Sequence, residues 1–598
     1  MLPAIAHWFA AADTTVAPLI AWLAVAIFIS GLDDLVVDVV WIYSRLTKPR
    51  RPHRLSGGPQ AHNEPRIAIF VPLWHEHEVI ANMVEHNIAA IDYRNYEFFL
   101  GAYPNDQPTI AAIHGLERRY GHVHVSLCPH DGPTSKADCL NWIYQRMLMY
   151  EEETSQRFSL VLIHDAEDLI HPHSLREIAR NAQQNDMIQI PVLPLPTRVH
   201  QFVHGIYCDE FAEVQIKDMI VRRVMGSFTP SAGVGTAYSR AALQKLAQAS
   251  SNRVFEPACL TEDYENGMRL HGLGCSQAFV PLTRSAKGFL ATREYFPRTI
   301  RAAIRQRTRW VTGIALQTWE RHGWRGSPGT MYWFWRDRKG LIGNPLSLFC
   351  NLVFFYGLLS GIVAGLARMP WDLCRSVDPS IAAATFYIVL FRTTVRMMCV
   401  ARVYGFIFAL AIPLRSFCAN YINATASFLA LCHFVSAKVR GRPLVWLKTE
   451  HAYPSRGTLV AHKRKLGEIL AGSAYVTERD LKAALDTQPD GVRIGEYLIK
   501  VGLLSQENLF EALSLQQGLP TGPVHPLEIA SATAHALPRR VVKYWQVLPF
   551  KISDGSMFVA TPEIPCDELT RELRGLTKLE IRFQLVTPDN FKRLVDVI

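Results

Sequence analysis

The sequence predicts an α/β fold in its first half, together with transmembrane helices and a small carboxy-terminal module that is a mainly helical α+β domain. Three observations lead to this prediction: strand-like and helix-like segments alternate from Arg66 onward, uncharged apolar runs lie on both sides of them, and a later stretch repeats itself. The 598 residues suffice for several domains with separate cores. We expect an anchor at 1–45, an α/β domain at 66–320, membrane and interfacial helices at 338–440, and a final domain at 461–598.

The composition indicates contact with a membrane and with anions. Hydrophobic residues make up 49% of the chain and charged residues 19%, and the net charge is +10. Phospholipid headgroups and nucleotide diphosphates are suitable anionic partners, whereas no nucleic-acid-binding motif accompanies the charge, so nucleic acid is not an expected partner. The 11 cysteines contain no C-x-x-C pair, which favours reduced thiols in a cytosolic environment.

The amino-terminal apolar segment predicts a retained membrane anchor. Residues 16–32 carry no charge, and the apolar character continues to Tyr43, which exceeds the ~20 residues needed to cross a bilayer. Five basic residues follow between 45 and 54, so the positive-inside rule places residues 45 onward in the cytoplasm. Three acids in this segment should face other helices or lie near headgroup depth: Asp33, Asp34 and Asp38.

A second apolar region predicts further crossings. Residues 341–367 form an uncharged run long enough to span a bilayer. Basic residues from Lys438 onward mark another cytoplasmic edge, so an odd number of crossings, one or three, is required between 368 and 438. We favour one crossing near 380–400, together with interfacial amphipathic helices.

The α/β region shows four short strand-like runs separated by helical periods. The runs are 67–71, 96–102, 122–128 and 160–164. Such alternation predicts a parallel, doubly wound sheet that binds ligands at the carboxyl ends of its strands.

Four short motifs with charged residues follow in order. They are S-K-A-D-C-L-N with Lys136, H-D-A-E-D with Asp165 and Glu167, T-E-D with Glu262 and Asp263, and Q-R-T-R-W with Gln306, Arg309 and Trp310. Asp165 and Glu167 follow an apolar strand two residues apart, so in an extended chain their side chains point the same way. Carboxylate oxygens suit Mg²⁺ or Mn²⁺, which can neutralise a departing diphosphate.

This ordered set resembles the processive, membrane-bound family 2 glycosyltransferases, whose nucleotide-sugar-binding fold is of the GT-A type. The resemblance implies that Asp263 is the catalytic base with Glu262 beside it, that Asp165 and Glu167 bind the metal ion, and that these carboxylates meet around one ion and one activated sugar. It further implies contacts to the nucleotide-sugar donor from Pro72, Glu76, Lys136, Asp165, Gly233 and Gly235. Gln306, Arg309 and Trp310 would cradle the pyrophosphate and the acceptor sugar.

The chain departs from the family pattern at two places. Glu167 stands where the family usually has aspartate, which makes its direct metal ligation less certain than that of Asp165. After the second strand the family usually has an acidic pair followed by Gly-Ser, whereas this chain has the sequence G-A-Y-P-N-D at 101–106. Asn105 or Asp106 is therefore the expected contact to the base, and specificity for uridine is in doubt.

Structural explanations compete with these roles. Thr261 could cap a helix whose first turn holds Glu262 and Asp263, which would favour its dipole. The arginine-rich stretch at 293–310 could be a basic helix on anionic lipid, and Gly233 with Gly235 could be a simple turn. Asp168 is expected to be a solvated or capping acid.

The carboxy-terminal region repeats itself at a fixed offset. K-L-G-E-I-L at 465–470 parallels R-I-G-E-Y-L at 493–498, an offset of 493 − 465 = 28 residues. The repeat resembles the paired motifs of the amino-terminal domain of type II secretion and pilus ATPases (the MshEN type), some of which bind cyclic di-GMP. The resemblance implies a cyclic di-GMP site formed by Lys465, Leu466, Gly467, Leu481, Leu485 and Gln488 with Arg493, Ile494, Gly495, Leu509, Leu513 and Gln516. Lys465 replaces the preferred arginine and Ala474 the preferred glycine. The alternative is a helical module that only packs.

The arrangement as a whole resembles the phage-adsorption glycosyltransferase B family. It implies a multi-pass protein of the bacterial inner membrane with cytoplasmic catalytic and carboxy-terminal domains. The implied activity is metal-dependent, inverting transfer from a nucleotide sugar to a growing surface polysaccharide, activated by cyclic di-GMP. The lipid bilayer and an outer-membrane export protein are further implied partners. Two alternatives remain: transfer of a single sugar to a lipid-linked acceptor, and a scaffold or phage-receptor component whose catalytic site is vestigial.

Overall fold

The computed structural model describes residues 2–47, residues 64–441 except 251 and 286, and most of 466–596. Its later gaps are 468–469, 471–474, 490, 518, 520, 523, 527–528, 530 and 554–555. The chain forms two compact units. Residues 1–81 and 95–453 make up the first, and residues 82–94 and 454–598 make up the second.

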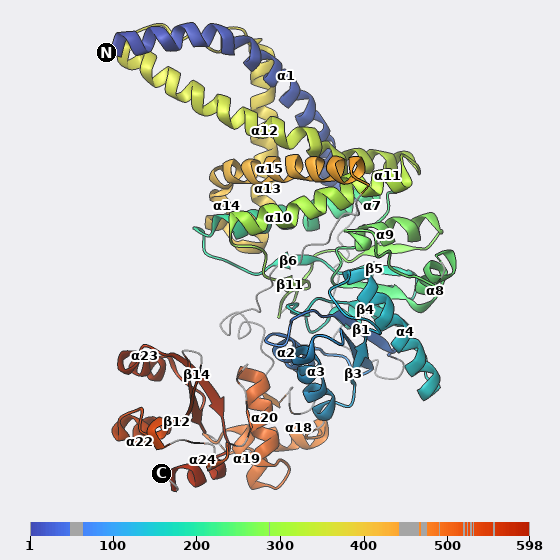
Figure 1. Ribbon diagram of the computed structural model, residues 1–598, viewed down its shortest axis with the longest axis vertical. Coiled ribbons are helices and arrows are strands. Elements are labelled where there is room, and N and C mark those ends of the chain that lie inside the picture. The colour runs from blue at the N-terminus through green and yellow to red at the C-terminus, as the bar shows by residue number, and fades with distance from the viewer. Residues whose placement is uncertain are drawn as a thin grey trace. The chain divides into compact units, whose positions relative to one another are not determined.

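A seven-stranded sheet lies at the centre of the first unit, with strand order β3-β2-β1-β4-β7-β5-β8 (Figure 1). Its strands are β1 (Ile67–Pro72), β2 (Tyr96–Ala102), β3 (Val123–Leu127), β4 (Leu160–Ile163), β5 (Met187–Gln189), β7 (Thr236–Ser239) and β8 (Gln277–Phe279). The first four coincide with the strands predicted from the sequence, and each neighbouring pair among them is parallel. The predicted α/β class is therefore confirmed.

The expectation that the whole sheet is parallel is wrong. β7 lies between β4 and β5 and pairs antiparallel with both. Between β5 and β7 the chain passes through β6 (Val192–Pro194), α6 (Phe202–Glu213), the π-helix η1 (Val214–Asp218) and α7 (Met219–Val224). This long excursion, rather than a single crossover helix, decides the direction in which the chain re-enters the sheet. Apolar periodicity in β7 carries no information about that direction.

Helices flank the sheet and hold its loops. They are α3 (Gln107–Arg119), α4 (Lys136–Thr154), α5 (Ser174–Asn181), α8 (Arg240–Ala249) and α9 (Glu262–Gly272). α2 (Ile80–Ala90) follows β1 in the chain and belongs largely to the second unit. α4 packs on β1 and β2. A Cβ atom at Gly101 would lie 2.6 Å from Sγ of Cys139 on α4, so this position in β2 must be glycine for the helix to approach.

Among the residues that the structure describes, four helices are long and apolar enough to cross a membrane: α1 (Leu2–Thr47), α12 (Pro328–Ala367), α13 (Pro379–Tyr404) and α15 (Ile412–Val439). The three crossings predicted from the sequence fall within α1, α12 and α13, and α15 is a further candidate. α15 packs against α6, α10 (Ile300–Trp310) and α12, and α10 and α15 run side by side in Figure 1.

Short elements complete the first unit. The π-helix η2 (Val311–Gln317) and α11 (Thr318–His322) continue from α10, and α14 (Phe406–Leu410) connects α13 to α15. Outside the main sheet, β11 (Thr292–Glu294) pairs in parallel with β6. β9 (Arg284–Ser285) and β10 (Gly288–Phe289) form a small antiparallel pair.

The acids Asp33, Asp34 and Asp38 of α1 face other helices, as expected from the sequence. Asp33 lies 2.7 Å from Arg336 of α12, and Asp34 lies 2.8 Å from Lys339 and also pairs with Arg392 of α13. Asp38 pairs with Lys217 of η1. The carboxylates are therefore neutralised by cations from three other elements, which joins α1 to the bundle.

The second unit contains the repeat and a three-stranded sheet. Its helices are α18 (Glu478–Thr487), α19 (Ile494–Lys500), α20 (Gln506–Gln517), α21 (Ser531–Ala534), α22 (Arg539–Trp545), α23 (Asp567–Leu576) and α24 (Pro588–Asp596). In the sheet, β13 (Ser556–Thr561) lies between β12 (Leu548–Ser553), its antiparallel partner, and β14 (Glu580–Leu585), its parallel partner. This mixture of helices and a small sheet agrees with the predicted α+β class.

Replacing Asp34 by leucine should destabilise the first unit. The change would leave Arg392 facing a buried position without the Asp34 carboxylate, and would leave Asp33 alone to balance both Arg336 and Lys339. Removing one partner of a buried ion pair costs roughly 3–5 kcal/mol, so we expect a lower midpoint of thermal unfolding in detergent. Asp372→Asn is the control, because Asp372 and Arg375 are exposed and 3.7 Å apart. Equal midpoints for the two variants would contradict the importance of this cluster.

Candidate functional site

The site is built around the ammonium group of Lys136 at the start of α4. Its Nζ lies 2.5 Å from Oδ1 of Asp165, which follows β4, and donates a hydrogen bond to the carbonyl oxygen of Gly233 at 3.2 Å. Burial alone would lower the pKa of Lys136, but the carboxylates of Asp165, Glu262 and Asp263 together raise it. The lysine therefore keeps its charge and links three segments that are distant in the sequence.

Asp168 is the last residue of the H-D-A-E-D motif, and its side chain stabilises the turn that this motif forms. Asp168 is fully buried, accepts a hydrogen bond from the backbone N–H of Asp165 at 2.9 Å and forms one with Nδ1 of His164 at 2.7 Å. Of the two expected roles, solvated or capping, the structure shows the second: Asp168 caps the turn from the interior. Burial raises its pKa well above the usual range and lowers the pKa of His164 to about 3. The sequence could not reveal this pair, because alternating acids look the same whether solvated or buried.

Glu262 and Asp263 form the first turn of α9. Thr261 occupies the N-cap position, but its side chain makes no capping hydrogen bond, so the purely structural explanation of T-E-D lacks its central contact. Burial, followed by the neighbouring Asp263 carboxylate, raises the pKa of Glu262 to about 7. Burial also raises the pKa of Asp263, against the opposing effect of Lys136. Both groups are thus more basic than ordinary carboxylates, as proton acceptors near neutral pH must be.

The glycine pair brings backbone against the acidic side chains. Gly233 and Gly235 have φ of 79° and 60°, which side chains other than glycine adopt rarely. A Cβ atom on Gly233 would lie 2.6 Å from Oδ2 of Asp263. The glycine pair therefore does more than reverse the chain. Gly233 leaves room for the Asp263 carboxylate, and its carbonyl oxygen accepts a hydrogen bond from Lys136.

Gln189 holds this glycine loop in place, and motif analysis missed it. It is buried at the end of β5, where Nε2 donates to the carbonyl oxygen of Val234 at 2.9 Å. Its Oε1 accepts from the backbone of Ala232 at 2.9 Å and from the hydroxyl of Thr236 at 2.7 Å. A single glutamine after a strand carries no recognisable signal in a sequence.

A cleft of about 660 Å³, counted with the part open to solvent, lies along the carboxyl ends of β1 and β4. Six residues predicted from the sequence line it: Pro72, Glu76, Lys136, Asp165, Glu167 and Arg309. Trp74 and Tyr103 add aromatic rings to its wall. The structure thus brings together residues from three of the four predicted motifs and from the end of the first strand and the loop after it.

Asp106 and Asn105 serve the loops beside this cleft. Asp106 is fully buried and accepts the backbone N–H of His75 at 2.6 Å, and these contacts lower its pKa against the effect of burial. Asn105 exchanges two hydrogen bonds with the backbone of Gly132, at 2.7 and 2.8 Å. Neither side chain lines the cleft, so the expected contact to a base has no support in their placement.

The Q-R-T-R-W motif ends α10. Arg309 reaches the cleft, whereas Trp310 packs among Tyr207, Phe211 and Phe296, with ring centroids 6.1 to 6.4 Å away. Within the described part of the chain, the buried Oε1 of Gln306 and Nε of Arg309 have no hydrogen-bond partner. Polar atoms in such positions are suited to a polar ligand.

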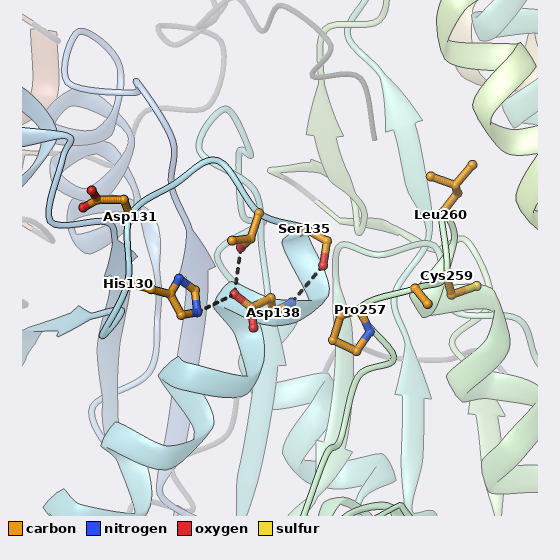
Figure 2. Close-up of a pocket in the computed structure, with 9 residues that line it drawn as sticks. His130, Asp131, Ser135, Asp138, Pro257, Cys259 and Leu260 are labelled. Atoms are coloured by element: carbon orange, nitrogen blue, oxygen red, sulfur yellow. Dashed lines mark hydrogen bonds and ion pairs between the residues drawn. The ribbon is translucent and has the colours of Figure 1, made fainter. Parts of the chain in front are cut away.

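A second cavity, of about 910 Å³ including open solvent, shares Thr134 and Ser135 with the cleft. Figure 2 shows His130 and Asp138 on one side of it, 3.2 Å apart, and Pro257, Cys259 and Leu260 on the other. The latter segment leads directly into Thr261–Glu262–Asp263.

The cleft contains carboxylate groups that could hold a metal ion. Over the described ranges, no group of three or more His, Cys, Asp and Glu side chains is placed to hold a metal ion. That Asp165, Glu167 and Asp263 meet around one ion and one activated sugar stays a prediction; in the structure Lys136 stands beside Asp165 and beside the Glu262–Asp263 pair. Two carboxylates in one cleft still fit Mg²⁺ or Mn²⁺, because such ions are commonly held by one or two carboxylates together with substrate phosphates.

The two copies of the repeat in the second unit share one contact. A Cβ atom on Gly467 would lie 3.2 Å from Leu481, and one on Gly495 would lie 2.6 Å from Leu509. Leu466 and Ile494 also pack in this core, whereas Lys465 lies outside the described residues.

Elsewhere the copies differ. Leu485 is 54% exposed, while its counterpart Leu513 packs against two hydrophobic clusters. Gln488 donates to the carbonyl oxygen of Val492, its counterpart Gln516 is half-buried, and Arg493 is exposed at the N-cap position of α19.

Comparisons with known proteins match two parts of the chain to family models and nearly the whole chain to a relative. Residues 65–313 match a family model described as glycosyltransferase like family 2, and residues 518–597 match the MshEN domain. The chain is 34% identical to bacteriophage adsorption protein B of Escherichia coli (strain K12), over 94% of this chain and 80% of that protein.

Two solved structures are also similar. Mannosyltransferase PcManGT from Pyrobaculum calidifontis, in complex with GDP-Man and Mn²⁺, is 15% identical with a TM-score of 0.40, covering 73% of this chain and 100% of that one. A structure of MshE with cdg is 27% identical with a TM-score of 0.20, covering 22% of this chain and 96% of that one.

Proposed function

Because the chain belongs to the family of bacteriophage adsorption protein B and contains a family 2 glycosyltransferase domain, we propose that it is an inverting glycosyltransferase that extends a surface polysaccharide from a nucleotide-sugar donor. The observation that carries the proposal is the meeting of Lys136, Asp165, Glu167 and Arg309 in one cleft, with Glu262 and Asp263 tied to it through Lys136 and Gly233.

Different charged groups of the cleft would bind different parts of the donor and its metal ion. Lys136 and Arg309 would hold the diphosphate, since the guanidinium and ammonium groups face the same cleft. Pro72 and Glu76 lie where the nucleoside would bind, beside the rings of Trp74 and Tyr103. Asp165 and Glu167 would hold Mg²⁺ or Mn²⁺, which supplies further positive charge against the leaving diphosphate when bound.

Asp263 would take the proton of the acceptor hydroxyl as its oxygen attacks the anomeric carbon. The new carbon–oxygen bond forms while the bond to the nucleoside diphosphate breaks, and the diphosphate leaves with the bonding electrons. Attack opposite the leaving group inverts the configuration. Burial and the neighbouring Asp263 raise the pKa of Glu262 to about 7. Below neutral pH Glu262 is therefore mostly protonated and adds no second negative charge beside the base.

The membrane helices suggest where this chemistry happens. We place α1, α12 and α13 across the bacterial inner membrane, with α15 at its cytoplasmic surface beside α10. Arg45 ends α1 on the side of the catalytic domain, in accord with the positive-inside rule. The catalytic unit and the carboxy-terminal domain then both lie in the cytoplasm. An outer-membrane export protein is a proposed partner for the polymer.

The MshEN domain suggests control by cyclic di-GMP. Arg493, with an exposed guanidinium, and the half-buried Gln488 and Gln516 offer hydrogen-bonding groups, and Leu485 offers exposed apolar surface. A ligand that prefers one arrangement of the domains would shift the population of the active form.

Replacing Asp263 by asparagine should abolish most sugar transfer. Asparagine keeps the shape but cannot take the acceptor proton, and loss of a general base lowers kcat by about 10²–10⁴. Transfer from a panel of UDP- and GDP-sugars is measured in membranes, with Glu152→Gln on the exposed side of α4 as the control. Unchanged transfer by Asp263→Asn would remove the base assignment. No transfer by the wild type with any donor would favour a vestigial site, and products of one added sugar would favour a lipid-linked acceptor.

The pH dependence of transfer should report the buried acidic pair. Burial raises the pKa of both carboxylic acids, so each keeps its proton to a higher pH than an exposed carboxylic acid does. Above about pH 7, the pKa of Glu262, this residue adds a second negative charge beside Asp263, so we expect kcat/KM to fall with pH through about 7 and this limb to be absent in Glu262→Gln. An identical profile for wild type and Glu262→Gln would show that the limb belongs to another group.

Cyclic di-GMP should bind the full-length protein and raise its transfer rate. Arg493→Ala should weaken binding about tenfold or more, since an arginine is lost from phosphate recognition. Calorimetry on the detergent-solubilised protein measures this, with Arg479→Ala, an exposed arginine of α18, as the control. No detectable heat at micromolar ligand would exclude this regulator.

A further inference from the structure

The second residue of the Q-R-T-R-W motif is anchored away from the donor cleft. Arg307 pairs with Glu210 of α6 at 2.7 Å and donates to Oδ1 of Asn423 on α15 at 2.6 Å. Its guanidinium carbon lies 4.5 Å from the ring centroid of Tyr207, also on α6. Asn423 in turn donates to Glu210 at 3.4 Å, so the three polar groups form a closed set.

This anchor determines where Arg309 points. Residues in an α-helix are separated by about 100° of rotation, so side chains two positions apart point in nearly opposite directions. Arg307 and Arg309 both lie within α10. With Arg307 held against α6 and α15, Arg309 faces the other side, where it lines the donor cleft.

The same helix also holds the segment before the catalytic carboxylates. α10 continues into the π-helix η2, where a Cβ atom on Gly313 would lie 2.3 Å from Oγ1 of Thr261. Gln317 accepts a hydrogen bond from the backbone of Leu260 at 3.0 Å and donates to Ala258 at 3.3 Å. A displacement of Arg307 would therefore shift both Arg309 and residues 258–261, which precede Glu262 and Asp263. π-helical turns are rare in proteins overall, and those that do occur are often found at functional sites.

α6 supplies a separate acid for each neighbouring helix. Asp209 pairs with Arg415 of α15 at 2.7 Å, and Glu213 pairs with Arg396 of α13 at 3.2 Å. Only Glu210 of these three contacts α10, through Arg307. Loss of Glu210 would thus remove the charged contact of Arg307 with α6, while the other two pairs keep α6 in place.

We propose that Glu210 is a positioning residue for sugar transfer, which holds Arg307 together with Asn423 and thereby aims Arg309 at the diphosphate of the donor. The inference rests on the proposed function, because it assigns Arg309 to the donor diphosphate. Glu210 does not itself line the cleft. Its effect on the affinity for the donor diphosphate is therefore indirect, through Arg307 and Arg309.

Binding of a nucleoside diphosphate tests this route. Calorimetry with UDP and with GDP, in the presence of Mn²⁺, measures the affinity of the full-length protein, and donor kinetics give kcat and KM. Glu210→Gln should weaken nucleotide binding and raise the donor KM about tenfold, as expected when a hydrogen bond to a charged group is lost. Arg309→Ala should have at least the same effect. Glu210→Gln combined with Arg309→Ala should be no worse than Arg309→Ala alone. Arg301→Gln, on the exposed side of α10, should behave as the wild type.

The outcomes separate this inference from the proposed function. Two results would overturn the positioning role alone. One is wild-type nucleotide affinity in Glu210→Gln. The other is a double variant whose loss of affinity equals the product of the losses in the two single variants. A wild-type protein that neither binds these nucleotides nor transfers sugar would overturn the proposed function itself. If Glu210→Gln does not fold, Asn423→Ala tests the same anchor from α15, with the same non-additivity expected.

Discussion

The arrangement of the site depends on one buried positive charge. Asp165, Glu262 and Asp263 come from two segments, and their carboxylates would repel one another in and beside the cleft. Lys136 lies 2.5 Å from Asp165, and its charge opposes the effect of burial on Asp263. The same ammonium group holds the carbonyl of Gly233, which fixes the glycine loop. Without this cation the acids could remain together only by taking up protons, and the cleft would lose the charge that attracts a diphosphate.

The sequence predicted the parts of this site that depend on local pattern. The four parallel strands could be found because each is a short apolar run, and Lys136, Asp165 and Arg309 could be found because their motifs have a characteristic order. Contacts between distant segments were not predictable. The direction of β7 follows from the long excursion through α6 and α7, and the role of Gln189 follows from where the glycine loop returns.

Acidic side chains were the most difficult to assign from sequence. Asp106 and Asp168 look like site residues or solvated acids, yet both are fully buried and hold backbone N–H groups of residues beside the cleft. A buried carboxylate must find donors, and backbone N–H groups of tight turns are the nearest ones. The charge of an aspartate is visible in a sequence, but its partners are not, so ligand and structural support can be told apart only in three dimensions.

The same argument applies to the two copies of the carboxy-terminal repeat. Their sequence similarity is reflected in the contacts Gly467–Leu481 and Gly495–Leu509, which depend on the spacing within each copy. Leu485 and Leu513 occupy equivalent positions but have different surroundings, because Leu513 packs against both the repeat and the core of the three-stranded sheet. Leu485 remains 54% exposed. A ligand that covered Leu485 would gain apolar contact without disturbing packing, whereas one that covered Leu513 would compete with the sheet. The copy with the less family-like sequence thus keeps the more accessible leucine, and symmetry in sequence does not become symmetry in binding surface.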